Sequence, residues 1–204
     1  HLEITEALHH SFSGTWEQIW GEDRIVENNY HEMTIRVQKT STPKRKFNVV
    51  FRLFNDGFGF RYEFPEQEAL KDFVIMDELT EFALTGDHKA WSIPYEAHFY
   101  EALYEASPVS KLGWVSTPLT METNDGLFLS IHEANLTDYA AMNLIPKEGS
   151  MTLKANLTPW STGEKVFMKA PGVTPWRTMI VAESAGDLLL SRLMLNLNEP
   201  CRIQ

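Results

Sequence analysis

The sequence is poor in cysteine, in long apolar runs and in positive charge. Its one cysteine, Cys201, excludes an internal disulfide framework and a cysteine-based zinc site. No run of about 18 apolar residues occurs, so we expect no membrane insertion. Lys plus Arg number 18 against 28 Asp plus Glu, which gives a formal charge of −10. A chain this acidic lacks the electrostatic footprint of a nucleic-acid-binding protein.

Aromatic and other apolar residues are plentiful. Hydrophobic residues make up 43% of the 204 residues, and six Trp and twelve Phe are among them. This content is enough to bury a core, so a disordered chain is excluded. No Pro-rich linker, internal repeat or low-complexity segment divides the chain. We therefore expect residues 1–204 to form one domain.

Period-two alternation of apolar and polar residues predicts β-strands through much of the chain. Residues 33–38 and 47–53 alternate in this way. Asn55, Asp56 and Gly57 then form a tight-turn signal, because these residue types tolerate positive φ. Apolar side chains at every second position of 58–64 complete a predicted β-hairpin.

A second hairpin is predicted around Asn124, Asp125 and Gly126, which separate 119–121 from 127–131. Further strands are predicted at 73–76, 82–84, 151–157, 178–182 and 193–197.

Helices are expected only in short segments. One is predicted over 184–192, with Ser184 as its N-cap, and another over 96–106. Strands therefore dominate, and ten Pro and eleven Gly are spread between them. The fold class that we predict is mostly β, a large antiparallel β-sandwich with few short helices.

Polar residues gather where the strand over 127–131 ends. Glu133 and Asp138 offer the hard oxygen donors that Ca²⁺ prefers, and His132 can bind a metal ion or transfer a proton. The alternative is that all three are surface residues at a strand end. The second His of a metalloprotease motif is missing at helical spacing.

Trp160, Trp176 and Arg177 form a second group of interest. An indole face can stack on a sugar ring, and a guanidinium can bind hydroxyl or carboxylate groups. The alternative is a Trp176 buried in the core with Arg177 in a structural ion pair. His88 follows a turn and is expected to be a solvated loop residue.

Six segments with a recognisable pattern follow one another from about Ser11 onward. They are residues 15–22, 51–65, 86–88, 131–134, 174–178 and 195–201. In these segments and in their order the chain resembles the N-terminal β-sandwich domain of glycoside hydrolase family 97, the family of starch-utilisation α-glucosidases and of α-galactosidases.

The resemblance implies a galactose-mutarotase-like sandwich that precedes a catalytic (β/α)₈ barrel in the same chain. The family's catalytic carboxylates lie on that barrel, so this chain is expected to be inactive alone and to begin after the family's first strands. The resemblance also implies that Glu133 is a ligand of an active-site Ca²⁺ whose other ligands are barrel glutamates. One carboxylate cannot hold Ca²⁺ by itself, because the ion takes six to eight oxygens.

The expected function is therefore that of a non-catalytic domain of a Ca²⁺-dependent α-glycosidase that acts on α-linked oligosaccharides. The resemblance implies a periplasmic or secreted location. It leaves open glucoside or galactoside specificity, and an inverting or retaining mechanism. Two other hypotheses are an autonomous carbohydrate-binding module, suggested by the aromatic content, and a mutarotase-like enzyme that uses His132 and Glu133.

Overall fold

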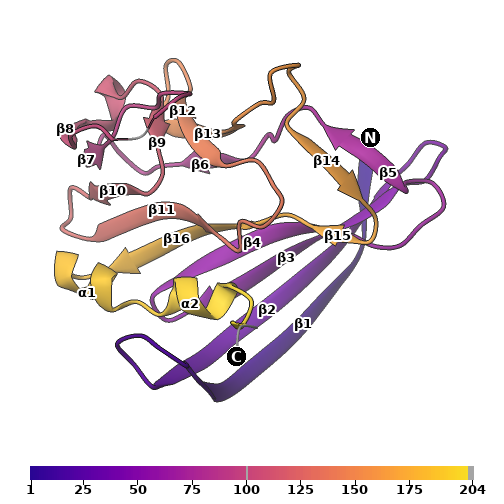
Figure 1. Cartoon of the computed structure of the whole chain (residues 1–204), viewed down its shortest axis with the longest axis horizontal. Helices are drawn as coiled ribbons and strands as arrows, with labels where there is room; N and C mark the ends of the chain where they lie inside the picture. Colours follow the sequence, from indigo (N-terminus) through magenta and orange to yellow (C-terminus); the bar gives the residue numbers. More distant parts are fainter. Residues whose placement is uncertain (100, 202–204) are drawn as a thin grey trace.

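The computed structural model describes residues 1–99 and 101–201 and consists mainly of three antiparallel β-sheets (Figure 1). The ten-stranded sheet runs in the order β1-β2-β3-β4-β16-β11-β10-β7-β8, with β15 paired to β4. Its strands are β1 (Leu2–Glu17), β2 (Ile25–Lys39), β3 (Lys46–Phe54), β4 (Gly57–Phe64), β7 (Lys89–Ser92), β8 (Glu105–Pro108), β10 (Leu119–Glu122), β11 (Phe128–Ala134), β15 (Gly172–Val173) and β16 (Trp176–Ala182).

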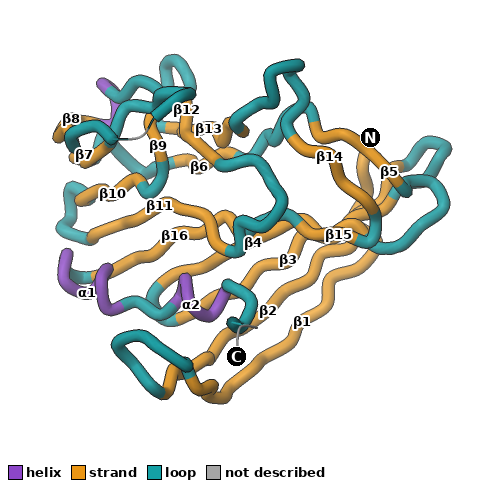
Figure 2. Tube along the Cα trace, in the orientation of Figure 1, coloured by secondary structure: helices purple, strands orange, loops and turns teal. Residues whose placement is uncertain are grey.

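Two smaller sheets and short helices complete the fold, and Figure 2 shows how little of the chain is helical. The four-stranded sheet contains β6 (Glu81–Ala83), β13 (Thr152–Leu157), β12 (Met142–Pro146) and β9 (Val115–Ser116), in that order. The two-stranded sheet pairs β14 (Val166–Lys169) with β5 (Asp72–Ile75). The helices are a 3₁₀ turn (Val109–Lys111), α1 (Ala185–Leu190) and α2 (Leu193–Leu197).

The two larger sheets pack face to face and confirm the predicted sandwich. Apolar side chains of β10 and β11 meet those of β12 and β13 in a core that includes Leu119, Ile131, Leu144 and Leu153, each fully buried. This burial of apolar surface is the main driving force that holds the sheets together.

The opposite face of the large sheet has a second, smaller core under α2. Trp176 and Ile180 of β16 pack there against Leu193 and Leu197 of the helix. Because β16 alternates its side chains between the two faces, it belongs to both cores. Trp176 and Ile180 face α2, so the odd-numbered residues between them point into the sandwich. Arg177 is one of these.

Both predicted hairpins are confirmed. Phe54 pairs with Gly57 across the first turn, and Glu122 pairs with Phe128 across the second. Gly57 has a φ of +147°, and a Cβ there would lie 2.2 Å from the carbonyl oxygen of Met179. Only glycine fits this turn without strain.

The strand predicted over 193–197 is wrong, because these residues form α2. Leu193 and Leu197, four residues apart, are both buried, whereas Leu195 between them is 37% exposed. Alternating leucines suggested a strand, but burial at i and i+4 is the spacing of a helix. The helix predicted over 184–192 is confirmed as α1, and the Ser184 hydroxyl accepts a hydrogen bond from the Asp187 amide.

Two further predictions are wrong. Over 96–106 the described residues contain no helix, and β8 begins at Glu105. His88 is buried rather than solvated, with 3% exposure. Its carbonyl accepts a hydrogen bond from the Val109 amide, and its Nε2 lies 3.1 Å from the Thr85 hydroxyl. The backbone of this histidine is therefore joined to the first residue of the 3₁₀ turn.

Strand β1 forms the outer edge of the large sheet and was not predicted. Its residues are exposed from the start of the strand to past Phe12. The strand therefore has no buried apolar face that would reveal it in the sequence. None of the helices in the described part of the chain has the length and apolar character needed to span a membrane.

Candidate functional site

A buried ion-pair network joins strands β11 and β16 to the loop between β5 and β6. Arg177 of β16 is fully buried and lies beside Glu133 of β11 in the sheet register. Its Nε and Nη2 donate to the two carboxylate oxygens of Glu78 at 2.7 and 2.6 Å, and its Nη1 donates to Glu133 Oε2 at 2.6 Å. We call Glu78, Glu133 and Arg177 the buried triad. The paired geometry with Glu78 is the strong, bidentate form of a guanidinium–carboxylate contact.

The buried triad carries unbalanced charge. One guanidinium and two carboxylates give the triad a formal charge of −1. Burial raises the pKa of Glu133, and the charge of Arg177 opposes that rise. Burial alone would lower the pKa of Arg177, but hydrogen bonding and the charges of Glu78 and Glu133 raise it above its usual value. Arg177 is therefore a permanent cation here.

Polar side chains around Glu78 complete the network. Thr80 Oγ1 donates to Glu78 Oε1 at 2.9 Å, and the Tyr139 hydroxyl donates to Glu78 Oε2 at 3.4 Å. The Tyr62 hydroxyl lies 3.1 Å from Thr80 Oγ1. Burial, followed by the charge of Glu78, raises the pKa of Tyr139, so its phenol stays protonated and donates. Glu78 therefore accepts from several donors, which fixes Arg177 in place.

Glu133 borders a cavity of about 420 Å³, which we call the Glu133 cavity. His132 and Asn143 also line it. Within 1–99 and 101–201, the buried atoms His132 Nδ1 and Asn143 Nδ2 have no hydrogen-bond partner. Burial lowers the pKa of His132, which favours its neutral form. The two unpartnered atoms are themselves shielded from solvent, so they are unsatisfied polar groups in residues of the cavity wall rather than groups already exposed to a ligand.

The Glu133 carboxylate has the capacity to bind a metal ion. Oε1 accepts the Met142 amide at 2.9 Å and Oε2 accepts Arg177 at 2.6 Å, so each oxygen has one partner. A carboxylate offers about four lone-pair sites, and two therefore remain. The surplus negative charge of the buried triad favours a cation. Glu133 thus fits as one oxygen ligand.

The described residues supply no complete metal site. No group of three or more His, Cys, Asp or Glu side chains that could hold a metal ion occurs among them. Ca²⁺ takes six to eight oxygens. Any ion bound at Glu133 must therefore obtain most of its ligands from water, substrate or residues outside this set.

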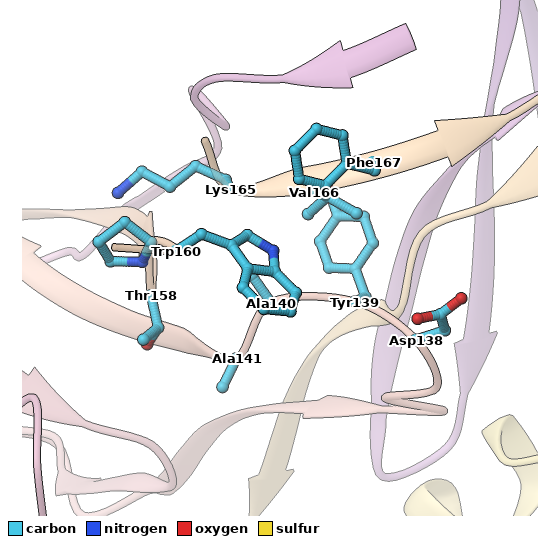
Figure 3. A pocket seen from close by; sticks show the side chains of 10 residues that line it. Asp138, Tyr139, Ala140, Ala141, Thr158, Trp160, Lys165, Val166 and Phe167 are labelled. Carbon is cyan, nitrogen blue, oxygen red and sulfur yellow. The ribbon is translucent and has the colours of Figure 1, made fainter. Parts of the chain in front are cut away.

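The structure separates Asp138 from Glu133. Asp138 lines another cavity, of about 360 Å³, together with Trp160 and Phe167 (Figure 3). The chain between Glu133 and Asp138 turns sharply, because Asn135 and Asp138 both have positive φ values of 56° and 51°. The three polar residues that the sequence grouped together are thus divided between two cavities.

The structural interpretation of Trp176 and Arg177 is confirmed. Trp176 is 1% exposed in the core under α2, and Arg177 is ion-paired. The guanidinium carbons of Arg52 and Arg61 lie 4.9 and 4.4 Å from the centre of the Trp176 ring. Cation–π contacts of this kind hold the indole in place. Trp176 is therefore not available to stack on a sugar.

Sequence reasoning missed Glu78 and Asn143. Glu78 is 99 residues from Arg177, and no motif or spacing links them. Asn143 lies in an apolar strand, and its only signal is that it is polar between Met142 and Leu144, which are both buried.

Solved structures similar to this chain are glycoside hydrolases. An enzyme of glycoside hydrolase family 97 from Pseudoalteromonas sp. strain K8, in complex with acarbose, matches 98% of this chain at 40% identity with a TM-score of 0.93. The chain covers 31% of that enzyme. A β-arabinopyranosidase matches at 21% identity with a TM-score of 0.78, which shows the shared fold alone.

Curated relatives are retaining α-galactosidases. The protein from Bacteroides thetaiotaomicron is 25% identical over 87% of this chain, and a probable retaining α-galactosidase from Streptomyces bingchenggensis is 29% identical over 69%. The chain spans only 30% and 21% of their lengths. The family model described as Glycosyl-hydrolase 97 N-terminal matches residues 1–200. The chain therefore belongs to the N-terminal domain family of glycoside hydrolase family 97.

Proposed function

We propose that this chain is the non-catalytic N-terminal domain of a Ca²⁺-dependent α-glycosidase, that it packs on a catalytic barrel, and that Glu133 completes the metal site of that barrel. The observation that carries this proposal is the position of Glu133. Its carboxylate borders a cavity, keeps free lone pairs and belongs to a buried triad with a charge of −1.

The residues around Glu133 have separate roles in this proposal. Arg177 and the Met142 amide orient the carboxylate, and Glu78 neutralises Arg177 so that the charge of Glu133 stays available. A bound Ca²⁺ would orient sugar hydroxyl groups and polarise groups near the scissile bond. Asn143 also lines the cavity, and its Nδ2 is buried without a partner in the described structure.

The proposed substrate is an α-linked oligosaccharide. Relatives support this class: the Pseudoalteromonas enzyme was solved with acarbose and, as an E480Q variant, with panose, and the curated relatives are retaining α-galactosidases. A periplasmic or secreted location is part of the same proposal.

Replacement of Glu133 in the full-length enzyme tests the metal role. We expect Glu133→Gln to weaken Ca²⁺ binding by at least about tenfold, since even partners that only touch a ligand change metal affinity by 10–100-fold. Calorimetric Ca²⁺ titration measures the affinity, and circular dichroism checks that the sandwich remains folded.

The matched control is Glu81→Gln, which removes an exposed carboxylate that pairs with Lys147 on the surface. It should leave the Ca²⁺ affinity unchanged. If Glu133→Gln binds Ca²⁺ as tightly as the parent enzyme, Glu133 is not a ligand.

A further inference from the structure

A second cavity is built around an exposed tryptophan. Trp160 and Phe167 are 62% and 60% exposed, and both line the cavity of about 360 Å³ that we call the Trp160 cavity. Figure 3 shows the indole of Trp160 between Lys165 on one side and Phe167 with Tyr139 on the other, and Asp138 beyond them. Two large aromatic side chains at one solvated hollow leave apolar surface without a partner.

The backbone holds Trp160 in a defined position. Its amide donates to the Glu164 carbonyl at 2.8 Å, and its carbonyl accepts from the Gly163 amide at 2.9 Å. Tyr139, on the opposite side, is anchored to the buried triad through Glu78. The walls of the cavity are therefore pre-organised, which reduces the entropy lost on binding.

The polar groups of the cavity are open to a ligand. In the part of the chain that the structure describes, neither the Asp138 carboxylate nor the Trp160 Nε1–H has a hydrogen-bond or ion-pair partner. Lys165 Nζ donates to the Leu157 carbonyl at 2.6 Å and has two further donors. An aromatic face in the same cavity as a carboxylate and free N–H donors suits a pyranose, whose ring carries apolar C–H faces and a rim of hydroxyl groups.

The Trp160 cavity adjoins the Glu133 cavity. Ala141 and Thr158 line both of them. These two residues form the shared wall of the two hollows, so an oligosaccharide that occupied both would pass over them.

We propose that the Trp160 cavity is a distal glycosyl-binding subsite, in which a sugar unit of an α-linked oligosaccharide stacks on Trp160 and hydrogen-bonds to Asp138. The proposal rests on the proposed function, because it takes the Glu133 cavity as the position of the reacting end. It adds that substrates long enough to reach Trp160 gain affinity from this domain, and that shorter ones do not.

The test is the dependence of kcat/KM on substrate length in the full-length enzyme. The probes are α-gluco- and α-galacto-oligosaccharides from disaccharide to pentasaccharide. In Trp160→Ala, the ratio of kcat/KM for the pentasaccharide to that for the disaccharide should fall about three- to tenfold, the range that one aromatic stacking contact supplies. Trp160→Phe should retain most of the parent ratio.

Trp20→Ala is the matched control, because Trp20 is 75% exposed and lines a different cavity. It should keep the parent ratio. A ratio that stays at the parent value in Trp160→Ala, or that falls equally in Trp20→Ala, overturns the subsite.

The two proposals fail separately. Unchanged Ca²⁺ affinity in Glu133→Gln together with a reduced ratio in Trp160→Ala removes the metal role and keeps the subsite. Weakened Ca²⁺ binding together with an unchanged ratio removes only the subsite.

Discussion

Replacement of Arg177 by Met should destabilise the protein strongly. The guanidinium makes three hydrogen bonds of 2.6–2.7 Å, and both of its partners are nearly inaccessible, with side chains 5% and 4% exposed. Met has a similar volume, so little cavity forms. The main effect is that Glu78 and Glu133 lose their counter-ion in a low-dielectric interior. Loss of one member of a buried ion pair destabilises by about 3–5 kcal/mol.

The free energy of unfolding measured in urea, by circular dichroism at neutral pH, tests this value. The control is Arg24→Met, since the pair of Arg24 with Glu17 is 82% and 59% exposed. An exposed pair contributes at most about 1 kcal/mol. A loss below about 1 kcal/mol in Arg177→Met would refute the reasoning.

A second variant checks the cause of the loss. If an uncompensated buried charge is responsible, Glu78→Gln added to Arg177→Met should recover part of the lost stability, because it removes one of the two carboxylates. Further destabilisation in the double variant would show instead that hydrogen bonding, rather than charge, dominates.

Two other positions have testable consequences. A Cβ at Gly59 would lie 2.5 Å from Leu197 Cδ1, so Gly59→Ala should destabilise the fold by about 1–3 kcal/mol in thermal unfolding. In a Leu197→Ala background the same substitution should cost less, because the atom that it meets is gone. Strictly additive losses of stability in the double variant would contradict a steric clash between the two side chains. The hydrogen bond from Lys154 lowers the pKa of Asp77 in the folded protein. The ionised carboxylate therefore stabilises the fold above its ordinary pKa of about 4. This stabilisation is lost as the pH falls through the lower pKa of the folded state. In Asp77→Asn the free energy of unfolding should therefore decrease less steeply with falling pH below about pH 4. Equal slopes of unfolding free energy against pH in the variant and the parent protein would rule this out.

Local sequence patterns were sufficient for the hairpins and not for the packing. Asn55, Asp56 and Gly57 determine a tight turn by their own backbone preferences, and the aromatic alternation after them follows from one buried face. Such signals lie within about ten residues, and the structure confirms both hairpins where they occur.

Features that depend on distant contacts could not be predicted. His88 is buried and its carbonyl accepts from the first amide of the 3₁₀ turn, and Glu78 meets Arg177 across 99 residues. The five-residue α2 is too short for its periodicity to be told from that of a strand. Residue type and place at a strand end made Glu133 and Asp138 candidate ligands, and the resemblance singled out Glu133. Its ion pair with Arg177 became visible only through the register of β11 and β16.

The position of β1 at the outer edge of the large sheet implies a gradient of rigidity across the molecule. β1 has one hydrogen-bonded neighbour, β2, and most of its side chains are exposed. Strands of this kind open locally at low free energy, so its amides should exchange with solvent long before those of β11 and β16. The latter two strands are held on both sides and tied together by Arg177. The Glu133 cavity therefore adjoins the slowest-exchanging part of the sheet, where thermal motion disturbs a bound ligand least.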